Sequence, residues 1–315
     1  MKRAFVFPGQ GSQAVGMGRA LAAAFAPARR VFEEVDAALA QNLSLIMFEG
    51  PESELTLTEN AQPALMAASL AVIHVLKTEG GVALDHNAAA FVAGHSLGEY
   101  SALAAAGGVG IGDTARLLRQ RGRAMQEAVP VGEGAMAALL GLDVEQGQEV
   151  AAEAAGADQV CAVANDNAPG QVVVSGHRRA VERAIAIARA HGARRSITLP
   201  VSAPFHSPLM APAAEVMSEA LDRITLRSPS VPLVANVSAT ATLDPDRIRR
   251  GLVEQVTAMV RWRESMLLFE QNCVEEIVEI GTGRVLTGLV KRIAPNISAR
   301  SVGTPEEVTA LIKEL

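Results

Sequence analysis

Cysteine and aromatic residues are scarce in this chain, and each shortage excludes a class of site. The two cysteines among 315 residues, Cys161 and Cys273, lie far apart and form no Cys-x-x-Cys or Cys/His cluster. The sequence therefore predicts neither a disulfide framework nor a metal site. Aromatic side chains make up 3% of the residues, with Trp262 and Tyr100 each the sole residue of its type. Such a chain has too few aromatic side chains for a surface on which nucleic-acid bases stack.

Long apolar runs and an excess of positive charge are also missing. No uncharged apolar run reaches the roughly 18 residues of a membrane helix, and residues 1–8 are typical of a strand, not of a signal peptide. The 28 basic and 34 acidic residues give a formal net charge of -6, which disfavours contact with nucleic-acid phosphates. We therefore expect a cytoplasmic protein that binds neither nucleic acid nor membrane. Its 49% hydrophobic content is ample for a buried core.

Loops that bind nucleotide phosphates are poorly represented. The chain has no Gly-Lys-Ser/Thr loop, which removes the common ATP and GTP sites. Residues 9–14 formally match the dinucleotide pattern G-x-G-x-x-A, but the acidic residues at the required distance fall inside a helical pattern over 15–40. A different use of this loop is to bring a backbone amide close to a reacting atom. The glycines of 108–112 are typical of a turn between helices, and those of 281–283 of a turn from strand to helix.

The most informative feature that is present is a serine between two glycines, Gly94-His95-Ser96-Leu97-Gly98, directly after the apolar run 88–93. This G-x-S-x-G pattern predicts a sharp turn from a strand into a helix that presents Ser96 as a nucleophile. The amide that follows the serine would face a developing oxyanion at the helix N-terminus. A serine that merely caps the helix is the alternative, but capping does not require the two glycines.

The hydrophobic periodicity predicts an α/β fold with a mainly parallel sheet covered by helices, because strand-like runs alternate with helical patterns. Between residues 131 and 200 the order changes to βαββαβ, which predicts an inserted ferredoxin-like subdomain. We therefore assign residues 1–130 and 201–315 to the core and 131–200 to the subdomain. The expected elements are strands at 3–7, 88–94, 135–142, 159–165, 171–175, 194–200, 231–235, 275–280 and 299–302, and helices at 15–40, 62–79, 97–106, 112–128, 144–155, 177–190, 208–223, 245–258, 262–272 and 305–314.

A nucleophilic serine needs a base, and His206 is the best of the six histidines. It lies between Pro204 and Pro208 at the expected junction of core and subdomain, where a cleft would form. His74 falls in an apolar helix, and His95 adjoins the serine on a turn whose neighbouring side chains point apart. No acid close to His206 in sequence is an obvious third member of a triad, so a backbone carbonyl could orient the ring.

Taken together, several ordered motifs resemble the bacterial malonyl-CoA:acyl carrier protein transacylase family. They lie at residues 7–13, 94–100, 120–122, 204–207 and 279–283, so the resemblance runs from the first predicted strand almost to the last helix. It implies an α/β-hydrolase-like core, and it also implies the ferredoxin-like subdomain that the periodicity already predicts. Thr282 stands where proline is frequent in the family, and the flanking glycines are intact.

The resemblance also implies a role for individual residues. Ser96 would be the nucleophile, His206 the base, and the backbone amides of Gln10 and Leu97 the oxyanion donors. Arg121 would bind the malonyl carboxylate, because a guanidinium can donate two parallel hydrogen bonds to a carboxylate. The main-chain carbonyl of Gln255 would orient the histidine. Phe205 beside the base would disfavour a branched acyl group.

The expected activity is transfer of malonyl from malonyl-CoA to the phosphopantetheine thiol of acyl carrier protein, through a malonyl-serine ester, in fatty-acid biosynthesis. We expect no bound cofactor and no metal, with malonyl-CoA as substrate, acyl carrier protein as partner and a monomeric chain. Side chains that could meet an acidic carrier are Arg119, Arg123, Arg194, Arg195, Lys291 and Arg292.

Two other functions use the same residues. A serine hydrolase would pass the acyl group to water, although Arg121 has no use with an apolar acyl chain. A docking module would bind carriers without turnover, although it would have no need of both Ser96 and His206.

Overall fold

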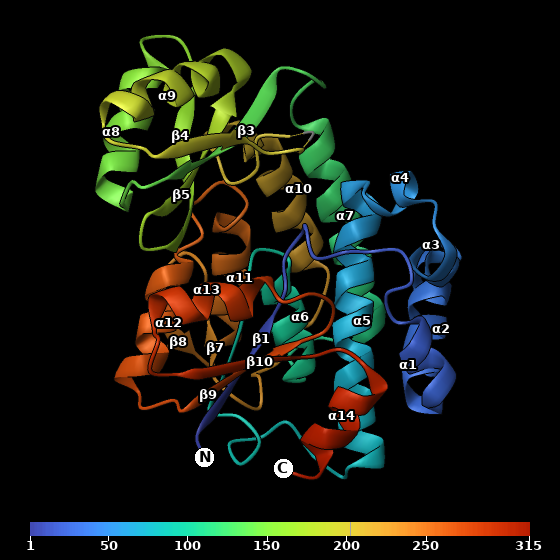
Figure 1. Ribbon diagram of the computed structural model, residues 1–315. Helices are drawn as coiled ribbons and strands as arrows, with labels where there is room; N and C mark the ends of the chain where they lie inside the picture. Colours follow the sequence, from blue (N-terminus) through green and yellow to red (C-terminus); the bar gives the residue numbers. More distant parts are fainter. Residues whose placement is uncertain (202) are drawn as a thin grey trace.

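The computed structural model describes residues 1–201 and 203–315, and in this part of the chain the strands form two sheets (Figure 1). The first sheet has the order β10-β9-β1-β2-β7-β8, and the second has the order β4-β5-β3-β6. The strands are β1 (Arg3–Phe7), β2 (Phe91–Gly94), β3 (Gly134–Leu140), β4 (Cys161–Ala168), β5 (Gln171–His177), β6 (Arg195–Thr198), β7 (Leu233–Val234), β8 (Ala241–Thr242), β9 (Glu276–Ile280) and β10 (Ser298–Val302).

The first sheet is parallel from β10 to β7, and only β8 runs antiparallel to its neighbour. Its central strand β1 is buried on both faces, with Phe5 and Phe7 on one side and Ala4 and Val6 on the other. This is the pattern expected of a parallel strand covered by helices on both faces. The carboxyl ends of β1, β2 and β7, which are neighbours in the sheet, open on the same edge.

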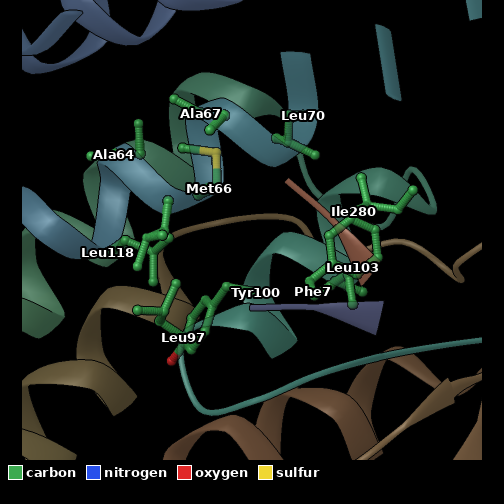
Figure 2. Packing of buried hydrophobic residues seen from close by; sticks show 14 of the residues in the cluster. Phe7, Ala64, Met66, Ala67, Leu70, Leu97, Tyr100, Leu103, Leu118 and Ile280 are labelled. Atoms are coloured by element: carbon green, nitrogen blue, oxygen red, sulfur yellow. The ribbon is translucent and has the colours of Figure 1, made fainter. Parts of the chain in front are cut away.

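Helices cover both faces of this sheet (Figure 1). They are α1 (Arg19–Ala24), α2 (Ala26–Leu39), α3 (Leu43–Glu49), α4 (Glu52–Leu55), α5 (Thr58–Glu79), α6 (Gly98–Ala105), α7 (Ile111–Glu127), α10 (Ala211–Asp222), α11 (Pro245–Glu254), α12 (Trp262–Gln271), α13 (Val285–Ile293) and α14 (Pro305–Ile312), with a 3₁₀ turn at Pro208–Met210. The long helix α5 contributes Ala64, Met66 and Leu70 to the buried cluster that also includes Phe7 and Tyr100 (Figure 2).

The second sheet is antiparallel and follows the predicted order β3-α8-β4-β5-α9-β6, with α8 (Val144–Ala155) and α9 (Arg178–Ala190) on one face. Its other face joins the main core, because Met136, Ala138 and Val173 belong to the same buried cluster as Phe5 and Phe7. The α/β-hydrolase-like core with a smaller ferredoxin-like unit predicted from the sequence is therefore confirmed. The boundaries at 131 and 200 stay a prediction.

The helix expected over 15–40 is wrong in detail. Gly16 and Gly18 have positive φ values of 96° and 79°, so the helix begins only at Arg19. It is interrupted at Phe25, whose backbone is extended, and resumes in α2 with Pro27 in the first turn. Proline has no N–H to donate to the preceding turn, which favours a break directly before it.

Several short elements escaped prediction. The sequence predicts no element where helices α3 and α4 and strand β8 lie, and the helix expected to end at residue 258 ends at Glu254. The strand expected over 231–235 pairs only over Leu233–Val234. Pieces of two to seven residues have too little periodicity to separate them from loops. The segment expected to carry the base, 200–208, includes residue 202, which lies outside the described residues.

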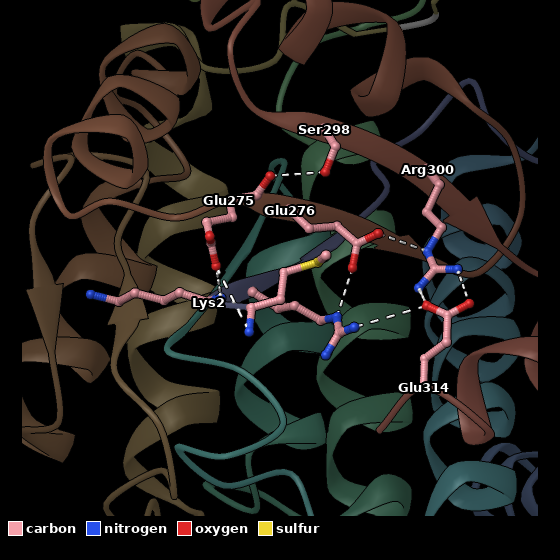
Figure 3. Close-up of polar contacts among 8 residues, drawn as sticks. Lys2, Glu275, Glu276, Ser298, Arg300 and Glu314 are labelled. Carbon is pink, nitrogen blue, oxygen red and sulfur yellow. Dashed lines mark hydrogen bonds and ion pairs between the residues drawn. The ribbon is translucent and has the colours of Figure 1, made fainter.

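The amino ends of the strands are tied together by ion pairs (Figure 3). Glu276 at the start of β9 contacts Arg3 of β1 at 2.6 Å and Arg300 of β10 at 3.1 Å. Arg300 also pairs with Glu314 near the C-terminus. Polar side chains at this edge therefore join neighbouring strands to one another and to the end of the chain.

Candidate active site

Ser96 lies on a strained turn between β2 and α6, with a φ of 53°. A Cβ atom on Gly94 would lie 1.9 Å from the backbone of Gly98, and one on Gly98 would lie 2.3 Å from the carbonyl oxygen of Phe7. Both flanking positions thus admit only glycine. The turn that the sequence pattern predicts is present, and positive φ at a non-glycine residue is the kind of strain found at functional sites.

The hydroxyl of Ser96 is 2.8 Å from Nε2 of His206. The other ring nitrogen, Nδ1, is 2.8 Å from the backbone carbonyl oxygen of Gln255. A carbonyl can only accept, so Nδ1 carries the proton and Nε2 is free to accept the hydrogen of the serine. His206 is 4% exposed, and burial, followed by the charge of Arg121, lowers the pKa of its imidazole to about 3. The ring is therefore neutral at pH 7 and can act as a base.

The carbonyl that holds His206 is available because a helix ends there. Helix α11 finishes at Glu254, and Gln255 is its C-terminal cap. The last carbonyl groups of a helix have no partner within the helix, so that of Gln255 can accept from an imidazole. His206 itself has a φ of 55°, a backbone conformation that residues other than glycine rarely adopt. The backbone on both sides of this hydrogen bond is thus fixed by local geometry.

Arg121 reaches the same serine from the buried face of α7. Its Nη2 donates to the hydroxyl of Ser96 at 3.1 Å and to Oε1 of Gln255 at 2.7 Å, and its Nη1 donates to Oε1 of Gln62 at 2.8 Å. The side chain is 1% exposed, and burial lowers the pKa of its guanidinium. Within residues 1–201 and 203–315 no carboxylate pairs with it, and its buried Nε has no partner.

Ser96, His206 and Arg121 line one cavity of about 630 Å³, together with Gln10, Leu97 and Phe205. The backbone amides of Gln10 and Leu97 make no hydrogen bond to any other described residue. The amide of Leu97 stands at the N-cap of α6, where the helix dipole favours negative charge. The structure thus brings together all six residues that the sequence singled out: Ser96, His206, Arg121, Gln10, Leu97 and Gln255.

Comparison with known proteins agrees with this geometry. Residues 4–304 match the family described as acyl transferase domain. The chain is 45% identical over 314 residues to the malonyl CoA-acyl carrier protein transacylase of Bacillus subtilis strain 168, with 100% of this chain and 97% of that protein covered. It is 45% identical over 310 residues to the protein of the same name from Escherichia coli K12, covering 98% of each.

The chain belongs to the malonyl-CoA:acyl carrier protein transacylase family.

Solved structures of this transacylase family have the same fold. The acyl-carrier-protein-S-malonyltransferase of Bartonella henselae is 55% identical, with a TM-score of 0.96 and coverage of 100% of this chain and 99% of that one. A malonyl-transacylase in complex with a type II PKS acyl-carrier protein is 42% identical, with a TM-score of 0.95 and full coverage of both chains. The resemblance found in the sequence motifs is confirmed.

Sequence reasoning missed Asn236, which holds the turn around Ser96. Its Oδ1 accepts from the Ser96 amide at 2.8 Å, and its Nδ2 donates to the Gly94 carbonyl at 2.7 Å. One signal could have found this transacylase residue, because it directly follows the strand expected at 231–235. Side chains that follow neighbouring parallel strands gather at one edge of the sheet.

Gln62 and Asn167 were also missed, and neither stands in a recognisable motif. Gln62 is a buried polar residue of α5 whose Oε1 accepts from Arg121. Asn167 belongs to β4 of the second sheet, and its Oδ1 is 2.9 Å from Nε2 of His95. The His95 ring therefore turns away from the serine toward the second sheet, as expected for neighbours on a tight turn.

The part of the chain that the structure describes contains no cluster of three or more His, Cys, Asp or Glu side chains arranged to hold a metal ion. None of its helices is long and apolar enough to cross a membrane. The cysteines are separate, with Cys161 buried and Cys273 exposed.

Proposed function

We propose that the chain transfers malonyl from malonyl-CoA to the phosphopantetheine thiol of acyl carrier protein through an ester on Ser96, in fatty-acid biosynthesis. The single observation that carries the chemistry is a serine hydroxyl within hydrogen-bond distance of both a neutral imidazole and a buried guanidinium. The proposed reaction needs no bound cofactor, because the chain itself supplies the nucleophile, the base and the donors to the oxyanion.

In the first step Nε2 of His206 takes the proton of Ser96 while Oγ attacks the thioester carbon. The amides of Gln10 and Leu97 donate to the oxyanion of the tetrahedral intermediate, where preorganised donors act most strongly. The carbon–sulfur bond then breaks, and the imidazolium returns the proton to the CoA thiolate. An ester between malonyl and Ser96 remains, and His206 is neutral again.

The guanidinium of Arg121 selects the acyl group in this proposal. It is a buried cation without a carboxylate partner in the described part of the chain, and the malonyl carboxylate would supply the missing charge. Two parallel charge-assisted hydrogen bonds from one guanidinium give both affinity and orientation. Phe205, 8% exposed, occupies the wall beside the base and leaves less room for a branched acyl group.

In the second step His206 takes the proton of the carrier's thiol, and the thiol sulfur attacks the ester carbon. The bond from that carbon to Oγ of Ser96 then breaks, and the imidazolium returns the proton to Oγ, leaving malonyl on the carrier. The solved complex of a similar malonyl-transacylase with an acyl-carrier protein supports a carrier as the acceptor. A serine hydrolase would use water here, and a docking module would form no ester at all. We propose a monomer that meets the acidic carrier through its basic side chains.

Intact-mass spectrometry after incubation with malonyl-CoA tests the first step. We expect a malonyl adduct on the wild-type chain, none on Ser96→Ala, and a strongly slowed adduct on His206→Ala. His74→Ala is the matched control, because His74 is a half-buried histidine that does not line the cavity. An adduct that persists in Ser96→Ala would overturn the assignment.

Radiolabelled malonyl-CoA with holo acyl carrier protein tests the second step. Label on the carrier is the expected result, and label released mainly as free malonate would favour the hydrolase. Size-exclusion chromatography with light scattering tests the monomer.

A further inference from the structure

Glu99 is a buried carboxylate that the reaction proposed above does not use. It lies in the first turn of α6, three residues after Ser96, and is 1% exposed. Burial is the first cause that raises the pKa of its carboxyl, to about 7. Burying a carboxylate in the core costs free energy unless hydrogen bonds or an opposite charge compensate for the lost water. The partners of Glu99 are therefore informative.

A single oxygen of Glu99 accepts two hydrogen bonds that lead to the site. Oε2 is 2.7 Å from Nε2 of Gln255 and 3.1 Å from the backbone nitrogen of Asn236. Asn236 holds the turn around the serine through its side chain. Oε1 of Glu99 is buried without a hydrogen-bond partner in the described part of the chain.

The bond to Gln255 decides which way the side-chain amide of that residue faces. Its Nε2 donates to Glu99 and to the backbone carbonyl of Ser96, so its Oε1 is turned toward Arg121. A rotated amide would place an NH₂ group against the guanidinium, donor against donor. The acceptors on one side, Glu99 and the Ser96 carbonyl, and the cation of Arg121 on the other therefore fix one orientation.

We propose that Glu99 is a positioning residue for acyl selection: its carboxylate fixes the Gln255 amide so that Oε1 holds the Arg121 guanidinium where it receives the malonyl carboxylate. This inference rests on the proposed function. In the described part of the chain the Glu99 carboxylate makes no hydrogen bond to Ser96 Oγ or to His206, so it acts through Gln255. Through the side-chain amide of Gln255, the buried cation of Arg121 is thus connected to the carboxylate of Glu99.

The proposal predicts a loss that depends on the substrate. Acylation by malonyl-CoA uses the Arg121 guanidinium, whereas acylation by acetyl-CoA has no carboxylate to place. Glu99→Leu removes the acceptor at similar volume, and we expect the preference for malonyl-CoA over acetyl-CoA to fall about tenfold or more. Glu99→Gln keeps an oxygen that can accept both hydrogen bonds, and its preference should stay within about threefold of the wild type.

The experiment measures single-turnover acylation of Ser96 by each thioester, using intact mass on the full-length chain. A wild-type chain that forms no malonyl ester would overturn the proposed function, and this is seen before any substitution is made. With that ester present, an equal loss for both thioesters in Glu99→Leu would mean a purely structural role and overturn the inference. A loss of preference in Glu99→Gln as large as in Glu99→Leu would overturn it too.

A second variant breaks the same link from the other side if Glu99→Leu fails to fold. Gln255→Met removes the side-chain amide and keeps the backbone carbonyl that accepts from His206. We expect the same fall of about tenfold in the preference for malonyl-CoA over acetyl-CoA, because the guanidinium of Arg121 loses the same acceptor. An unchanged preference in this variant would overturn the inference.

Discussion

The ionisation of His206 is decided by its surroundings at the scale of a single residue. Because burial and Arg121 lower its pKa to about 3, the ring should stay neutral far below the 6.5 of a free histidine. In ¹⁵N-histidine NMR spectra recorded from pH 7 to pH 4.5, we expect the His206 nitrogens to keep their neutral shifts.

The sign for stability follows from the same shift. Below pH 6.5 the imidazole of His206 is protonated in the unfolded chain but stays neutral in the folded chain. The free energy of unfolding therefore falls as the pH falls toward 3. The His206→Ala variant should lose this part of the acid dependence. A His206 ring that titrates near pH 6.5 would contradict both expectations.

Arg121 shows how a site residue can oppose stability. It is a buried cation without a carboxylate partner in residues 1–201 and 203–315, and burial lowers its pKa. We predict that Arg121→Met lowers acylation by malonyl-CoA about 100-fold or more, because two charge-assisted hydrogen bonds to the carboxylate are lost. Stability in urea should stay equal or rise, since an apolar side chain has no desolvation cost.

Arg119→Met is the matched control on the same helix. Arg119 donates to the backbone carbonyl of Glu59 at 2.8 Å and to Gln41, so its loss should lower stability with little effect on acyl preference. An Arg121→Met variant that is clearly less stable than wild type and keeps its preference for malonyl-CoA would contradict the prediction.

At the scale of elements, the turn from β2 to α6 depends on its glycines. A Cβ at position 94 would overlap the backbone of Gly98, which no rotamer change can relieve. We predict that Gly94→Ala lowers the free energy of unfolding by at least about 4 kcal/mol or prevents folding. Gly288 in α13 has open space around it, so Gly288→Ala should stabilise by about 1 kcal/mol. Urea unfolding of both variants checks the pair, and equal effects would contradict it.

Helices and strands with a regular repeat of apolar residues could be predicted from the sequence. Elements whose position depends on tertiary contacts could not. The helix expected at 144–155 matches α8 at both ends, because its apolar stripe is regular and Asp143 caps it. The short helices α3 and α4, of seven and four residues, are too short to show such a stripe over several turns. Ser96 carries its own local pattern, whereas Gln62 acts only because α7 places Arg121 beside it. The site could thus be predicted where a residue shapes its own backbone.

At the scale of the whole molecule, the topology gathers the site at one edge of the first sheet. Gln10 follows β1, Ser96 follows β2 and Asn236 follows β7, three neighbouring parallel strands. The opposite edge carries the ion pairs of Glu276 and Arg300 instead (Figure 3). In open parallel sheets ligands bind at the carboxyl ends of the strands. The strained turn of the site therefore lies at one edge of the sheet, and the ion pairs that join the strands lie at the other.

The second sheet is fastened to the segment that orients His206. The amide of Asp166 in β4 donates to the carbonyl of Val260 at 3.0 Å, and the amide of Val260 donates to the carbonyl of Ala164 at 2.9 Å. Beside these bonds, Nε of Arg263 donates to both oxygens of Asp166, at 3.1 and 2.9 Å. This ion pair joins β4, which carries Asp166, to α12, which carries Arg263 and follows Gln255 in the chain.

We predict that Arg263→Met lowers the free energy of unfolding by about 1–3 kcal/mol, because Asp166 is 1% exposed and its charge would be left without its cation. Adding Asp166→Asn should recover most of that loss, since the neutral amide is cheaper to bury. Urea unfolding of the two single variants and the double variant measures the coupling. Acylation should fall with stability, because Asn165 beside Asp166 lines the cavity. A double variant less stable than Arg263→Met would mean that another contact fastens the second sheet.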